Sequence, residues 1–353
     1  MKRISNLYEK ICDINNIMDM YKKIKISNKI RKEKFDDFYS MNVVDIYNKL
    51  ISKNYIFDKY NIFTIFEPKE RIIMSLKIKD KIVNHLVAYY FLDFENSYID
   101  SNIAARIGKG TSYGIKLTKK YLNQIKDKEF YILKFDIKKY FYNIDHNKLK
   151  EMVLRKIKDK DALNLIFQII DSTNYINNYG YVPGKGIPIG NMTSQVFGIF
   201  YLNDLDHFIK EKLKIKYYIR YMDDGILIHE DKDYLKYCLS EITKFLAEYK
   251  LILNHKTKIY TKKEGLTFLG FRFIVKNNKV LVKVRNETKR KFQKKMRKLY
   301  VLYKDKKISF ENYYQSFSSY KGHLQNGSCY NLINKNMRFD TFEGIEVKVE
   351  DYL

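Results

Sequence analysis

The chain has 353 residues, enough for two or three subdomains, and its 67 Lys and Arg outnumber its 41 Asp and Glu to give a net charge of +26. This excess indicates a polyanionic partner, in the simplest case nucleic acid, although a chain so rich in Lys, Ile, Asn and Tyr is also what an AT-rich genome produces unselected. Three widely spaced cysteines suggest neither a disulfide framework nor a zinc site, and no apolar run approaches the ~18 residues of a membrane span, so we expect a cytoplasmic protein without a membrane partner.

The predicted elements alternate between helices and strands. Residues 1–60 are predicted to be helical, with a basic run at 22–34, and residues 62–78 form a short hairpin around Pro68. Further helices are expected at 81–98, 147–172, 193–213 and 233–249, and strands at 131–137, in the hairpin 217–229 and around 266–275, before a helical, basic tail. This alternation favours an α+β or α/β core with helices on one face of a sheet.

Glycine and proline are rare, with 14 and 3 residues, and they cluster. Five glycines and two prolines fall between residues 180 and 198, and three more glycines lie in RIGKGTSYG, residues 106–114. We expect sharp turns or close approach to a ligand at both places, with ordinary loop punctuation as the alternative for the second cluster.

Two adjacent carboxylates, Asp223 and Asp224, interrupt the apolar hairpin YYIRYMDDGILIH, residues 217–229. Aspartate is a poor strand residue, and neighbouring like charges repel. Asp136 follows a strand expected beside this hairpin, and three converging carboxylates would suit divalent ions such as Mg²⁺. Asp224-Gly225 is also a common hairpin-turn signal, and the two interpretations are compatible.

The motifs around these carboxylates resemble those of reverse transcriptases. YMDD between apolar strands is similar to the family signature, FDIKKYFYNID and GIPIGNMTSQVFGIFYLNDLD resemble the first two palm motifs, and NHKTKIY and FLGFRF resemble the fourth and fifth. EPKERIIMSLKIKDKIVNH and RIGKGTSYG resemble the fingers motifs of bacterial, group II intron-like enzymes. All of them occur in the family's order across roughly residues 67–275.

The resemblance implies a right-hand polymerase with an α+β fold, an antiparallel-sheet palm and a helical thumb. The expected division is an N-terminal helical extension at 1–60, fingers at 61–130 and 150–185, a palm at 131–149 and 186–275, and a thumb at 276–353. Residues 283–307 carry 12 Lys or Arg and only 2 acids, with Phe292, Met296, Leu299, Tyr300 and Tyr303 at helical spacing. A helix of this kind is suited to tracking duplex phosphates.

The resemblance also implies a two-metal catalytic site. Asp136 and Asp223 would hold both ions, with Asp224 nearby and the carbonyl of Ile137 as a further ligand. Two Mg²⁺ ions, with Mn²⁺ as a substitute, would lower the pKa of the primer 3′-hydroxyl and stabilise the leaving pyrophosphate.

Further positions match residues that contact the nucleotide in the family. Phe141 would lie under the incoming sugar and exclude a ribose 2′-hydroxyl, with a plain core role as the alternative. Lys69 and Arg71 would grip the triphosphate unless the hairpin is only a solvated charged surface, and Lys256 falls where the family often has a lysine thought to protonate the pyrophosphate.

Other positions match contacts with the nucleic acid. Arg106 and Lys109 are candidates for template or primer contacts, and Tyr221 and the loop Leu269-Gly270 would position the primer end. The implied partners are an RNA template, a DNA primer or cDNA, dNTPs, and an accessory protein or a structured non-coding RNA.

One position departs from most relatives. Ile189 precedes Gly190 where they have Gln, which contacts the nascent base pair. This wording and the following SQ at 194–195 resemble the error-prone enzymes of diversity-generating retroelements, so we expect low fidelity. The alternative role is an antiphage defence enzyme that copies a dedicated non-coding RNA. A nucleotide cyclase would leave the fingers and thumb motifs unexplained, and the presence of all three aspartates argues against an inactive nucleic-acid-binding relative.

Overall fold

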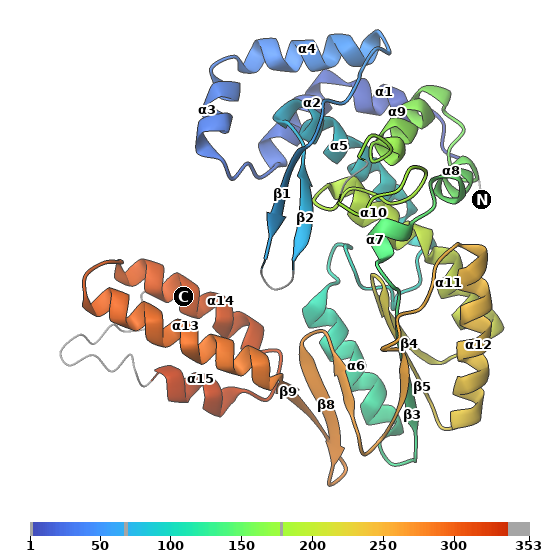
Figure 1. Cartoon of the computed structure of the whole chain (residues 1–353), viewed down its shortest axis with the longest axis vertical. Helices are drawn as coiled ribbons and strands as arrows, with labels where there is room; N and C mark the ends of the chain where they lie inside the picture. Colours follow the sequence, from blue (N-terminus) through green and yellow to red (C-terminus); the bar gives the residue numbers. More distant parts are fainter. Residues whose placement is uncertain (1–2, 67–69, 177–178, 338–353) are drawn as a thin grey trace. The chain divides into compact units, whose positions relative to one another are not determined.

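Helices and short antiparallel sheets make up residues 3–66, 70–176 and 179–337, the part of the chain that the computed structural model describes (Figure 1). The chain divides into two compact units. The first comprises residues 1–107, 135–226 and 236–257, and the second comprises residues 108–134, 227–235 and 258–353. Among the described helices, none is both long and apolar enough to cross a membrane.

The first unit begins with helices, as predicted for residues 1–60, although residues 52–60 are not helical. Their bounds are Leu7–Cys12 for α1, Ile14–Lys23 for α2, Lys29–Asp36 for α3 and Tyr39–Ile51 for α4. Asp13 starts α2 because its side chain accepts hydrogen bonds from two backbone N–H groups of the first turn. Helix α2 packs on α4 and on α5, Ile78–Phe91, which continues into the 3₁₀ turn η1, Leu92–Ser97.

The predicted hairpin at 62–78 is confirmed. Strand β1, Asn61–Ile65, pairs antiparallel with β2, Arg71–Ser75, in a register that joins Ile65 to Arg71. Pro68 and Lys69 lie outside the described residues.

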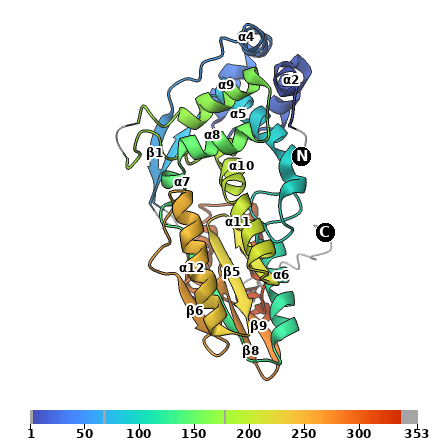
Figure 2. The same cartoon turned by 90° about the vertical axis from the view of Figure 1, so that its right-hand side faces the viewer.

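Helices α5, α8, α9 and α10 gather side by side in the first unit (Figures 1 and 2). The predicted helix at 147–172 is two helices, α8 at His146–Leu154 and α9 at Lys160–Asp171. Each begins at an aspartate, Asp145 or Asp159, whose side chain accepts a backbone N–H of the first turn, so the second aspartate marks the break.

The predicted long helix at 193–213 is also broken. Helix α10, Met192–Tyr201, ends at Leu202, whose φ of −100° and ψ of 9° are not helical. Helix α11, Asn203–His207, and the π-helical turn η2, Phe208–Lys212, follow. The apolar spacing continues across the break, which is why the sequence pattern does not reveal it.

Four strands form one sheet in the order β4-β5-β3-β6. They are Tyr217–Tyr221, Asp224–His229, Tyr131–Asp136 and Lys258–Thr261. Strands β3 and β6 are antiparallel, with Tyr131 opposite Thr261. Helix α12, Lys232–Glu248, follows β5 and confirms the predicted helix at 233–249.

The second unit contains a three-stranded antiparallel sheet and several helices. Strands β7, β8 and β9 span Leu266–Phe268, Phe271–Lys276 and Lys279–Val284, and α6, Thr111–Ile125, packs on β8 and β9. Helices α13, α14 and α15 span Asn286–Lys304, Phe310–Leu324 and Tyr330–Met337. The basic helix is confirmed, with Phe292 and Met296 buried, whereas β9 lies where only a helical tail was expected.

Candidate active site

The ends of β3 and of the β4–β5 hairpin bring Asp136 and Asp223 together. Asp136 is the last residue of β3, and Asp223 lies in the turn between β4 and β5. The N–H of Ile137 donates a hydrogen bond to the carbonyl of Asp223 at 3.3 Å, and the N–H of Asn254 donates to the carbonyl of Asp136 at 2.7 Å. Backbone hydrogen bonds therefore hold both acidic positions in place.

The two carboxyl groups influence each other electrostatically. Burial, and then the negative charge of Asp136, raise the pKa of Asp223 to about 6, while Arg220 and Arg71 act in the opposite direction. A second like charge near a partly desolvated carboxylate makes its ionised form unfavourable unless a cation is present.

A divalent ion fits this pair by its chemistry. Carboxylate oxygens are the ligands that Mg²⁺ and similar hard cations prefer, and a cation offsets the repulsion between Asp136 and Asp223. Across the residues that the structure describes, however, no three Asp, Glu, His or Cys side chains form a group able to hold a metal ion. Asp224 is the first residue of β5, and its place beside the other two carboxylates in a metal site stays a prediction.

The hairpin turn is not the one that the Asp-Gly pair predicts. The turn residues are Met222 and Asp223, and Met222 takes the left-handed conformation with a φ of 57°. Gly225 instead lies within β5, where a Cβ atom would come within 2.3 Å of the ring of Phe135. This glycine makes room for a core ring instead of bending the chain, so the turn prediction was wrong.

Buried hydrogen bonds of Arg220 stabilise this turn. Its guanidinium donates to both carboxylate oxygens of Asp206 at 2.6 Å, and both side chains are 0% exposed. The same guanidinium donates to the carbonyl of Met222 at 2.7 Å, and Tyr218 donates its hydroxyl hydrogen to Asp206 at 2.8 Å. The planar guanidinium of Arg220 thus links Asp206 of α11 to Met222, the residue before Asp223.

Phe141 lies next to the same turn. A Cβ atom placed on Gly198 of α10 would be 3.4 Å from the Phe141 ring and 3.0 Å from the sulfur of Met222, so the two side chains meet over this glycine. Phe141 is half-buried, and its carbonyl accepts the N–H of Ile187 at 2.8 Å. The ring and the side chain of Met222, the residue before Asp223, therefore both lie close to Gly198.

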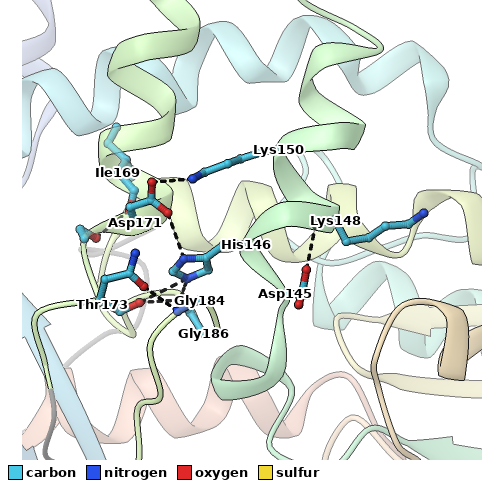
Figure 3. A network of polar contacts seen from close by, with 11 residues as sticks. Asp145, His146, Lys148, Lys150, Ile169, Asp171, Thr173, Gly184 and Gly186 are labelled. Carbon is cyan, nitrogen blue, oxygen red and sulfur yellow. Dashed lines mark hydrogen bonds and ion pairs between the residues drawn. The ribbon is translucent and has the colours of Figure 1, made fainter.

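A buried histidine anchors the glycine-rich loop that carries Ile189 (Figure 3). Nε2 of His146 donates to the carbonyl of Gly186 at 2.7 Å, and Nδ1 lies 3.1 Å from a carboxylate oxygen of Asp171. Thr173 donates to the same carbonyl at 2.8 Å, and Lys150 pairs with Asp171 at 2.5 Å. Helices α8 and α9 together hold the loop.

The far end of this loop meets the β1–β2 hairpin. The N–H of Met74 in β2 donates to the carbonyl of Ile189 at 2.8 Å. Gly190 has a φ of 120°, and a Cβ there would lie 3.0 Å from Ile73 and 3.1 Å from the carbonyl of Met74. Only glycine tolerates this conformation easily, so the backbone of 189–190 is held against β2.

The basic candidate residues of the first unit differ in solvent exposure and in whether their charged groups already have partners. Arg71 is exposed at the start of β2, and its charge acts on Asp223. Lys256 is exposed in the loop that follows Asn254, whereas Lys69 lies outside the described residues. Arg106 is 8% exposed because its guanidinium pairs with Glu95 and donates to two backbone carbonyls, which leaves little of it for a nucleic acid.

The remaining primer and template candidates lie on loops and strand ends. Tyr221 is the half-buried last residue of β4. In the second unit, Lys109 lies 4.0 Å from the centre of the Tyr113 ring. Leu269 and Gly270 form the tight turn between β7 and β8, with φ values of 51° and 83°.

The residues that sequence reasoning missed are Arg220, Asp206 and His146. Arg220 interrupts an apolar strand, and a charge in such a place is a signal of a buried ion pair. Its partner Asp206 and the pair of His146 with Asp171 could not be found, because these contacts join separate elements.

Comparison with known proteins gives the family of this chain. The family described as reverse transcriptase (RNA-dependent DNA polymerase) matches residues 59–273, more than half of the chain. The chain belongs to the reverse transcriptase family.

Two curated relatives match at low identity. The COX1/OXI3 intron 2 protein of Saccharomyces cerevisiae is 25% identical over 203 residues, covering 40% of this chain and 23% of that protein. Protein YkfC of Escherichia coli is 24% identical over 183 residues, covering 42% of this chain and 48% of that protein. The chain thus spans about a quarter and about half of the length of these relatives.

A solved structure confirms the fold. Telomerase from Candida albicans, in complex with a fragment of telomeric RNA, matches with a TM-score of 0.51 and 13% identity, covering 88% of this chain and 67% of that one. The chain therefore has the expected α+β, right-hand polymerase fold.

Proposed function

We propose that this protein is an RNA-directed DNA polymerase that makes cDNA by two-metal nucleotidyl transfer. The observation that carries the proposal is the pair of Asp136 and Asp223 on neighbouring strand ends, close enough that one raises the pKa of the other. A reverse transcriptase family match over residues 59–273 supports it.

The metal site would use Asp136 and Asp223, with the carbonyl of Ile137 and with Asp224 nearby. Two Mg²⁺ ions, when bound, would activate the primer 3′-hydroxyl and neutralise the leaving pyrophosphate. The buried brace of Arg220 supports this assignment because it keeps the turn at Met222 rigid.

The nucleotide would be held by groups around this pair. Phe141 would pack under the sugar and exclude ribonucleotides, and its position beside Met222 supports this role. Arg71 would donate to the triphosphate through its forked guanidinium, together with Lys69, and Lys256 would protonate the pyrophosphate. Ile189 and Gly190 would border the nascent base pair.

The nucleic acid would be held by the remaining candidates. Tyr221 and the turn Leu269-Gly270 would position the primer end, and Lys109 would contact template or primer. The guanidinium of Arg106 is occupied by two backbone carbonyls, so Arg106 would support such contacts mainly by holding that backbone in place.

The proposed division of the chain into N-terminal extension, fingers, palm and thumb has the boundaries given above.

We further infer that synthesis is error-prone and serves a diversity-generating retroelement. Ile189 offers an aliphatic chain where an amide would otherwise probe the base pair, and the backbone of 189–190 is held against β2. The partners would then include a template RNA and an accessory protein.

Incorporation of labelled dNTPs on an RNA template with an annealed DNA primer tests the activity. We expect extension with Mg²⁺ or Mn²⁺, none with chelator, and strong preference for dNTPs over NTPs. Extension on DNA templates only, or none with any divalent metal, would refute the activity.

Sequencing the RNA and cDNA that co-purify with the protein tests the biological role. A diversifying enzyme should yield cDNA with errors concentrated at template adenines. An abundant single non-coding RNA copied faithfully would point to the antiphage role instead and would contradict the inference.

A further inference from the structure

One face of the sheet β7-β8-β9 collects every charged side chain of its strands. The strands contain four cations and no acid. Residues 272, 274 and 276 of β8 and residues 279, 281 and 283 of β9 share this face, with Arg272 opposite Lys283 and Lys276 opposite Lys279. All four cations are exposed, and the half-buried Ile274 and Leu281 form the pair between them. We call this surface the β8–β9 face.

The opposite face of the same sheet is the buried one. Its residues are apolar and buried: Phe271, Phe273, Val280, Val282 and Val284. Helix α6 packs on β8 and β9, and the N–H of Ser328 donates to the carbonyl of Val282 at 2.7 Å. The sheet is thus anchored from one side, and its cations all point to the other.

Like charges directly opposite each other destabilise an antiparallel pair. This sheet contains two such pairs, Arg272 with Lys283 and Lys276 with Lys279. Within the described part of the chain, no carboxylate forms an ion pair with any of the four, and Arg272 donates only to the carbonyl of Glu264 at 3.4 Å. Two repelling pairs without an internal anion are the pattern expected of a surface that receives an external one.

The spacing of the cations fits a regular polyanion. Four residues of strand separate the two cation pairs, a distance of about 13 Å. A strand of double-stranded DNA carries one phosphate per about 3.4 Å of helix axis, hence about four over that distance, and an RNA duplex likewise carries one phosphate per nucleotide along each strand. Neighbouring β-strands lie about 4.8 Å apart, so the two cations of each pair can contact the same phosphate backbone from either side.

We propose that the β8–β9 face binds the phosphate backbone of double-helical RNA, as a site for a folded part of the RNA partner outside the copied segment. The proposal rests on the proposed function, which makes RNA the partner. Recognition would be electrostatic and independent of sequence, since lysine is a point charge and the central residues are aliphatic.

The test replaces the four cations by glutamine, as Arg272→Gln, Lys276→Gln, Lys279→Gln and Lys283→Gln in one variant. The probe is a blunt RNA duplex with no primer end to extend, and its affinity is measured by fluorescence anisotropy over a series of KCl concentrations. We expect weaker binding and a log–log salt slope shallower by about three to four, at about 0.9 for each phosphate that the variant no longer neutralises. Extension of a short annealed template–primer should be retained.

Two controls make the result decisive. Glutamine at Lys22, Lys49, Lys128 and Lys244, which already pair with carboxylates, removes the same charge elsewhere and should leave the slope unchanged. A variant with arginine at the three lysines of the face keeps the charge and should bind like the wild type, which also checks folding.

The outcomes separate this proposal from the proposed function. An unchanged slope in the glutamine variant, or an equal loss in the charge-matched control, overturns the RNA site. If the glutamine variant loses as much affinity for a DNA duplex as for the RNA duplex, or more, the face is a general phosphate site and the commitment to RNA is overturned. Absence of extension by the wild type overturns the polymerase proposal but leaves the duplex-binding measurement to stand alone.

Discussion

Arg220 and Asp206 place two opposite charges where no part of either side chain is exposed. Replacing such a pair with apolar residues is often neutral for stability, so the ion pair alone does not explain its presence. The additional hydrogen bond from Arg220 to the carbonyl of Met222 does, because it fixes the turn that presents Asp223. We therefore propose that Arg220 is a positioning residue for Asp223.

Arg220→Lys should lower kcat about 10²-fold with a smaller change in KM, because one ammonium cannot reach Asp206 and Met222 in the same forked geometry. Single-turnover extension and substrate titration measure the two constants. Arg155→Lys is the matched control, since Arg155 pairs with Asp204 at the surface and should be nearly silent. A kcat for Arg220→Lys close to that of the wild type would contradict the brace.

Asp223→Asn should raise the free energy of unfolding in chelator at pH 7.5 by about 1 to 3 kcal/mol. The folded-state pKa is raised from 3.8 to about 6, so the folded protein holds the extra proton between these values and loses stability as pH rises through them. The gain should shrink toward pH 4. Urea titrations at both pH values measure it, and a destabilised variant at pH 7.5 would refute the raised pKa of Asp223, which comes first from burial and then from the charge of Asp136.

Phe141→Ala should allow incorporation of ribonucleotides, because it removes the ring that we place under the sugar. Competition between dNTPs and NTPs during extension measures the selectivity. Phe141→Tyr keeps the ring and should keep the preference. Unchanged selectivity in the alanine variant would assign Phe141 to the core instead.

At the scale of elements, the loop 180–190 shows how the fold positions one side chain from several sides. His146 and Thr173 hold the carbonyl of Gly186, and β2 holds the carbonyl of Ile189. A side chain presented by a loop fixed at both ends can act as a specific probe, which a mobile loop cannot.

Ile189→Gln should lower the misincorporation frequency, most clearly at template adenines, because an amide can then hydrogen-bond at the nascent pair. Deep sequencing of cDNA from a defined RNA template measures it. Ile189→Leu controls for any change at this position and should remain error-prone. An unaltered error spectrum in the glutamine variant would count against the fidelity assignment.

Sequence patterns predicted most of these helices and strands, but not the turns and breaks between them. The hairpin β1–β2, strand β3 and helix α12 follow from apolar spacing, and Asp159 could have marked the start of α9. The turn at Met222 could not be predicted, because methionine seldom takes a left-handed conformation and the Asp-Gly pair gave a false signal. Strand β9 was missed because its alternating pattern merges into the basic helix α13.

At the scale of the whole molecule, the order of motifs along the chain predicted the family and the fold, and both are confirmed. The net charge of +26 predicted a polyanion in general but no particular surface. The register of β8 with β9 supplies one, since it aligns four cations that are 11 residues apart or fewer in the sequence. Charge composition and strand register together carry the RNA-binding proposal.

In the proposed function, Asp136 and Asp223 form the catalytic pair of a DNA polymerase that copies RNA. Asp136→Asn removes one carboxylate at nearly constant volume, and Asp19→Asn, at an exposed position, is its control. Single-turnover extension on an RNA template should fall about 10³-fold or more for Asp136→Asn and stay unchanged for the control, with template–primer affinity preserved in both. Extension by Asp136→Asn at close to the wild-type rate would contradict the account.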